Sequence, residues 1–158
     1  MKTKLLALIV AFLITPFVAF ARAFTPQGMD ALNTQGTHGD ITRTAEGALS
    51  AHLLLTFGTA PGSQVKVCTA STRPLGFAHD DAASAAKVGV ELLLSGGTRL
   101  AIASKAIAAG VRVYATAGGK LTDAVVAGAY LVGESLTAAA ADGDEFEIMP
   151  LSPVENPA

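Results

Sequence analysis

Short segments of alternating apolar and polar residues constrain the fold of this chain more than any other feature. In the segment 48–57, one side carries Leu49, Ala51, Leu53, Leu55 and Phe57. Alternation with a period of two is typical of a strand with one buried face. Further short strands are predicted over 63–69, 88–95, 98–102, 111–116, 120–122, 130–136 and 145–148, and no long amphipathic helix interrupts them. The sequence therefore predicts a mainly β fold, a small barrel or sandwich of about eight short antiparallel strands.

Glycine-containing turns separate these strands and predict which of them pair. Residues 58–62, with Pro61 among them, turn the first strand into the second. Two glycine pairs, Gly96-Gly97 and Gly118-Gly119, each stand between two strand segments, and such pairs favour tight hairpins. The turn Asp142-Gly143-Asp144 leads into the last strand.

The composition predicts a core of small side chains. Half of the residues are apolar (51%), but tryptophan is absent and aromatic residues make up only 6%. Alanine, valine, leucine and isoleucine must then fill the interior, with few large anchors. A core of this kind gains further burial by self-association, so we expect a homo-oligomer.

The N-terminus has the three-part layout of a secretory signal peptide. Lys2 and Lys4 precede the apolar segment 5–20, which ends in Ala21-Arg22-Ala23. That segment is shorter than a membrane-spanning helix requires, and Pro16 interrupts it. We therefore expect export to the periplasm or beyond, with cleavage after Ala23. The alternative, which stays open, is that translation starts at Met29.

The rest of the chain divides into three parts. Residues 24–44 contain several glycines with little apolar periodicity and are predicted to form a flexible arm. Residues 45–151 form the β-rich domain, and 152–158, with two prolines, form a loose tail.

Charge and cysteine content exclude several classes of function. The net charge is −2 and no basic cluster occurs, which argues against nucleic-acid binding. After signal cleavage no membrane association is expected. Cys68 is the only cysteine, so no intrachain disulfide can form. Its apolar neighbours favour a buried strand residue over a reactive thiol.

No combination of residues predicts catalysis. His79-Asp80-Asp81 is the one cluster that resembles a cation or acid–base site, but adjacent loop residues splay apart and no further ligands are near. Ser84-Ala85-Ala86-Lys87 matches the Ser-x-x-Lys pattern without its partner motifs. Nucleophile-elbow, phosphate-loop and dinucleotide fingerprints are missing. Glu134, Glu145 and Glu147 are predicted to face solvent. We therefore expect a protein that is not an enzyme, with no catalytic, cofactor-binding or metal-binding residues and no cofactor.

The order of the motifs resembles the capsid cement, or head decoration, proteins of tailed phages and prophages over residues 42–150. The motifs, in order, are Thr42-Arg43-Thr44-Ala45, Pro74-Leu75-Gly76, Asp80-Asp81-Ala82-Ala83, 90–96, 106–114, Ala117-Gly118-Gly119-Lys120, Tyr130-Leu131-Val132-Gly133 and Asp142-Gly143-Asp144.

This resemblance implies a compact β domain in the virion, with no active site. Such a protein binds the outside of the major capsid lattice and stabilises it, and its partners are the major capsid protein and itself, as a homotrimer. The predicted arm could then lie along a neighbour. Capsid accessories assemble in the cytoplasm, so the export signal conflicts with this role unless translation starts at Met29.

A second hypothesis accepts the export signal. Residues 106–113 also resemble the turn of β-clip domains, including the periplasmic chaperone that assembles the flagellar P-ring. This alternative predicts an exported assembly or carbohydrate-binding module of the periplasm.

Overall fold

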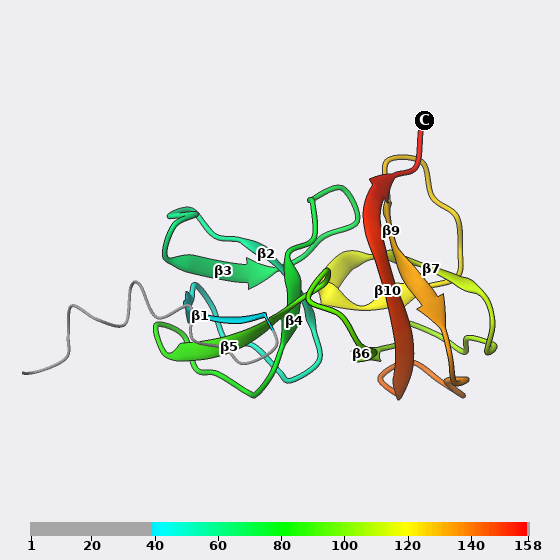
Figure 1. Ribbon diagram of the computed structural model, residues 1–158, viewed down its shortest axis with the longest axis horizontal. Helices are drawn as coiled ribbons and strands as arrows, with labels where there is room; N and C mark the ends of the chain where they lie inside the picture. Colours follow the sequence, from blue (N-terminus) through cyan, green and yellow to red (C-terminus); the bar gives the residue numbers. More distant parts are fainter. Residues whose placement is uncertain (1–38, 158) are drawn as a thin grey trace, which may run out of the picture. The chain divides into compact units, whose positions relative to one another are not determined.

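The computed structural model describes residues 39–157, drawn in colour in Figure 1. These residues form ten strands. The strands are β1 (Asp40–Ala45), β2 (Leu54–Phe57), β3 (Gln64–Val67), β4 (Gly76–Ala78), β5 (Lys87–Leu92), β6 (Arg99–Ile102), β7 (Arg112–Ala115), β8 (Leu121–Thr122), β9 (Tyr130–Ser135) and β10 (Glu145–Glu155), with one 3-10 turn, η1 (Ala117–Gly119). The mainly β fold expected from the alternation is confirmed. Over the same residues, no helix has the length and apolar character to cross a membrane.

The first five strands close into a barrel in the order β1-β3-β2-β4-β5, drawn in cyan and green in Figure 1. Antiparallel pairing of β1 with β5, from Asp40–Glu91 to Thr44–Lys87, completes the ring, and β1 runs parallel to β3. Closure pairs the strand edges that would otherwise remain open. The interior holds small apolar side chains, as the composition predicts: Ala45, Leu49, Leu55, Val65, Ala78, Ala82, Val88 and Val90.

The last five strands form a second sheet in the order β6-β10-β9-β7-β8. A single parallel bridge between Ala103 and Leu121 joins its two ends and curls the sheet. Phe146 and Ile148 point into its core, and Glu145 and Glu147 alternate with them on the other face, in agreement with the period-two pattern.

The barrel contributes side chains to the core of the second sheet. Leu54 and Phe77, both fully buried, belong to the same apolar cluster as Val113, Phe146 and Ile148. The barrel and the second sheet therefore share one apolar core, to which both contribute side chains.

The first predicted strand, 48–57, is shorter and buried differently than expected. Only Leu54–Phe57 form a strand, and Leu49 makes an isolated bridge with Ala82. Phe57, expected in the core, is 46% exposed, while Leu54 from the expected polar side is fully buried. The reason is that both faces of β2 are covered: Leu55 faces the barrel interior and Leu54 faces the second sheet.

Two of the predicted hairpins are confirmed and one is wrong. The turn at 58–62 joins β2 to β3, and Gly118-Gly119 joins β7 to β8. Gly96-Gly97 instead connects the barrel to the second sheet, because β5 is already paired with β1 and β4 on its two edges and leaves none for β6. β6 pairs with β10, about fifty positions further along the chain.

The ordered strands extend beyond the predicted domain limits at both ends. β1 includes residues 40–44, which the sequence analysis places in the arm, and β10 continues into the predicted tail, where Val154 pairs with Leu131 and Glu155 with Tyr130. The signal-like segment 1–23 and arm residues 24–38 lie outside the described residues.

The second sheet repeats the topology of the barrel. Its strands β6 to β10 correspond in order and pairing to β1 to β5, and the bridge Leu49–Ala82 recurs as Ile107–Ala139. Three left-handed positions recur at a constant spacing of 58: Gly39 and Gly97, His52 and Gly110, Ala85 and Gly143. The chain therefore contains two copies of one five-stranded motif, which the sequence analysis did not detect.

A close backbone contact is also repeated. A side chain at Gly76 would lie 2.2 Å from the carbonyl of Glu91, and one at Gly133 would lie 2.5 Å from the carbonyl of Met149. Only glycine allows the neighbouring strand to approach this closely in each copy.

Candidate functional site

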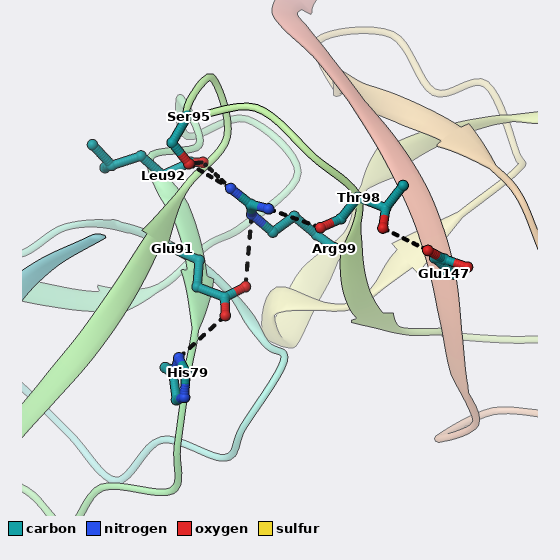
Figure 2. A network of polar contacts seen from close by, with 7 residues as sticks. All are labelled: His79, Glu91, Leu92, Ser95, Thr98, Arg99 and Glu147. Carbon is teal, nitrogen blue, oxygen red and sulfur yellow. Dashed lines mark hydrogen bonds and ion pairs between the residues drawn. The ribbon is translucent and has the colours of Figure 1, made fainter. Parts of the chain in front are cut away.

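A polar network ties the barrel to the start of the second sheet (Figure 2). The Arg99 side chain, only 10% exposed, lies with Nε 3.6 Å from Oε2 of Glu91. Its Nη1 donates to the Thr98 carbonyl at 2.8 Å, and its Nη2 donates to the Leu92 carbonyl and the Ser95 hydroxyl. These contacts hold the connection between the two sheets against β5.

Glu91 stands at the centre of this network and contacts two basic side chains. Besides Arg99, its Oε1 lies 3.1 Å from Nδ1 of His79 on the barrel. The carboxylate is therefore committed to contacts within the fold. We interpret the network as a structural clamp.

The cluster His79-Asp80-Asp81, the one candidate for a cation or acid–base site, does not converge. His79 turns toward Glu91, while Asp81 Oδ1 accepts a hydrogen bond from the backbone N–H of Ala51 at 2.8 Å. Asp80 is exposed. Within residues 39–157, no group of three His, Cys, Asp or Glu side chains is placed to hold a metal ion.

Ser84 and Lys87 have different surroundings in the barrel. The Ser84 hydroxyl donates to the Glu46 carbonyl at 3.3 Å beside the left-handed residue Ala85. Lys87 is exposed at the start of β5.

Cys68 is fully buried, as its apolar neighbours predict. Its Sγ donates to the carbonyls of Thr69 and Thr72 at 3.3 and 3.2 Å. Burial raises the pKa of the Cys68 thiol above its ordinary value, against the lowering effect of the hydrogen bonds with Thr72 and Thr69. The side chain therefore stays protonated and packs as a small apolar group.

Two surface regions carry apolar side chains that the fold leaves open. The first is a groove of about 330 Å³ beside the barrel, lined by Phe57, Arg73, Pro74, Leu75, Leu92, Leu93, Leu94 and Pro153. Leu94 is 68% exposed there.

The second is the outer face of the second sheet, where Glu134, Glu145 and Glu147 lie as predicted. Leu100 and Met149 are exposed on the same face, and Leu136, just after β9, is exposed beside them. The sequence did not predict that these three side chains would be exposed. Leu100 shows why: alternation places Leu100 and Ile102 on one face of β6 and Ala101 on the other, but it does not tell which face is buried. In the structure the core side is that of Ala101.

Comparison with known proteins gives one family match and a similar solved structure. The family model of the phage cement protein matches residues 34–150. No curated protein sequence matches the chain. Among solved structures, the head fiber gp8.5 N base of bacteriophage phi29 is similar in fold, with a TM-score of 0.59 and 17% sequence identity over 74% of this chain and 98% of that chain. Because the family match spans the barrel and most of the second sheet, this chain belongs to the phage cement protein family.

Proposed function

We propose that this protein binds the outside of the major capsid lattice of a tailed phage and stabilises the shell, without enzymatic activity. The observation that carries the proposal is the family match over residues 34–150, which gives the chain a capsid-associated structural role in the virion. A likeness in fold to a phage head fiber base supports it.

The architecture suits this role physically. A closed barrel and a curled sheet that share one core resist deformation, because neither can open without exposing the apolar residues of the other. Many copies on a lattice add their contacts, so moderate contacts per copy are sufficient to reinforce the shell.

The partners in this proposal are the major capsid protein and further copies of the chain, as a homotrimer. Exposed apolar side chains in the groove and on the second sheet offer contact surfaces for both. Signal cleavage after Ala23 and the choice between Met1 and Met29 stay predictions about residues outside the described part.

The β-clip alternative receives no separate support. The turn on which it depends, at Ile107–Gly110, recurs in the first copy of the motif at Leu49–His52, with the same bridge to an alanine. The turn is therefore part of this fold's repeat.

Deletion of the gene from the phage that carries it tests the proposal. Mutant shells are expected to lose this protein, to rupture at lower temperature than wild-type shells, and to regain stability when the purified chain is added back. Co-sedimentation with the mutant shells measures binding directly. Absence of binding at micromolar concentration would refute the capsid role.

A further inference from the structure

Three exposed apolar side chains surround one carboxylate on the outer face of the second sheet. Glu147 of β10 is the cross-strand partner of Leu100 on β6, and the backbone N–H of Leu136 donates to its carbonyl at 2.7 Å on the other side. Met149 follows two positions later and points to the same face. Leu100, Leu136 and Met149 are 42 to 44% exposed. Cross-strand and next-but-one neighbours lie within about 5–8 Å, so Leu100 and Met149 flank the carboxylate. Leu136, the first residue after β9, lies beside Glu147 through its backbone hydrogen bond.

The charge of this face is acidic. Glu134 and Glu145 lie on it with Glu147, and Arg112 is the cross-strand partner of Glu134. At its edge, Arg99 and His52 line a pocket together with Glu147 and Leu100. Glu145 lies 3.8 Å from the His52 imidazole. Glu147 accepts a hydrogen bond from the Thr98 hydroxyl, and within residues 39–157 no Lys, Arg or His nitrogen forms an ion pair with it.

One row of the equivalent face on the barrel is buried against the second sheet, and Met149 of the open face belongs to the corresponding row. Leu54, Phe77 and Glu91 on the barrel correspond to Arg112, Glu134 and Met149 on the second sheet, because the two rows have equivalent pairings. On the barrel, Leu54 and Phe77 of this row are fully buried against the second sheet. On the second sheet, the equivalent row is open. A head-to-tail arrangement of two copies leaves one such face without a partner.

We propose that this open face docks a segment of the partner protein that carries an arginine or lysine between apolar residues. The cationic group binds Glu147, and the stem of that side chain packs on Leu100, Leu136 and Met149. The carboxylates on this face complement a basic surface and disfavour an acidic one. This inference rests on the proposed function, because it names the face of the chain that meets the capsid and the chemistry of the capsid surface it meets.

The face is tested independently of the capsid with a peptide probe. A short synthetic peptide with one arginine between two leucines is titrated into the isotope-labelled full chain while amide chemical shifts are followed. We expect saturable shifts centred on β6, β10 and the end of β9, and none with a control peptide that carries glutamate in place of arginine. Shifts confined to other surfaces, or no shifts, overturn the proposal.

Variants then connect the face to the capsid. Glu147→Lys reverses the central charge, and Leu100→Ser removes one exposed apolar neighbour without opening the core. The matched control is Asp80→Lys, the same change of a carboxylate to an ammonium at an exposed position of the barrel. In co-sedimentation with shells that lack the protein, we expect Glu147→Lys to bind about tenfold more weakly or worse, and the control to bind within twofold of wild type.

The possible results separate the two proposals. If wild type and all variants bind shells equally, another face meets the capsid and the present inference is wrong, while the capsid role stands. If wild type does not bind shells but the arginine peptide shifts this face, the capsid role is wrong and the face binds a basic segment elsewhere. A circular dichroism spectrum identical to wild type confirms that each variant folds.

Discussion

The shared core predicts that the barrel and the second sheet unfold together, and Phe77 tests this most directly. Phe77 lies on the barrel but is fully buried in the cluster that contains Val113, Phe146 and Ile148 of the second sheet. Phe77→Ala removes a large side chain and leaves a cavity in the core that the barrel and the second sheet share. We expect the free energy of unfolding to fall by about 3–5 kcal/mol. Domains of this size have total stabilities of about 5–15 kcal/mol, so the loss is a large fraction of the whole.

Urea unfolding followed by far-ultraviolet circular dichroism and by tyrosine fluorescence measures the change. Phe57→Ala is the matched control, since Phe57 is the same residue type but 46% exposed, and we expect a loss of less than about 1 kcal/mol. Both probes are expected to report one transition with the same midpoint in wild type. Equal losses for the two variants, or two separate transitions, would refute the shared core.

Three further predictions concern single positions. Because burial raises the pKa of Cys68, little of its thiol ionises near pH 8, and Ellman's reagent is expected to modify it slowly in the folded chain and rapidly in urea; equal rates would contradict this. Ala85 is left-handed, so Ala85→Gly is expected to raise the free energy of unfolding by about 1 kcal/mol, whereas Ala83→Gly lowers it. Arg99→Met breaks the clamp between the sheets and is expected to lower the free energy of unfolding by about 1–3 kcal/mol. The exposed control Arg112→Met is expected to lower it by about 0.5 kcal/mol, and urea titration measures both changes.

The local pattern of the sequence was sufficient to predict the class of fold and two of its hairpins. Alternation of the kind seen at Phe146 and Ile148 depends only on neighbours along the chain, and so do the turns at 58–62 and 118–119. The order of these local features also carried the resemblance that the family match later confirmed.

The local sequence pattern could not predict which strands distant in the chain pair with each other. Gly96-Gly97 has the chemistry of a hairpin turn, but the partner of β6 is β10, because β5 is occupied on both edges. The repeat escaped detection for a related reason. Its equivalent positions share backbone conformation and register rather than side-chain identity, as His52 and Gly110 illustrate.

For the candidate sites, residue order alone specified which side chains share a face of a strand, as it did for Glu145 and Glu147. It also specified that Cys68 sits among apolar neighbours and that no familiar catalytic motif is present. Tertiary structure decided what covers each face: Leu54 is buried by the second sheet, while Leu100 and Met149 stay open to solvent. The physical reason is that strand alternation is a property of local backbone geometry, whereas burial depends on which distant segment packs against that face.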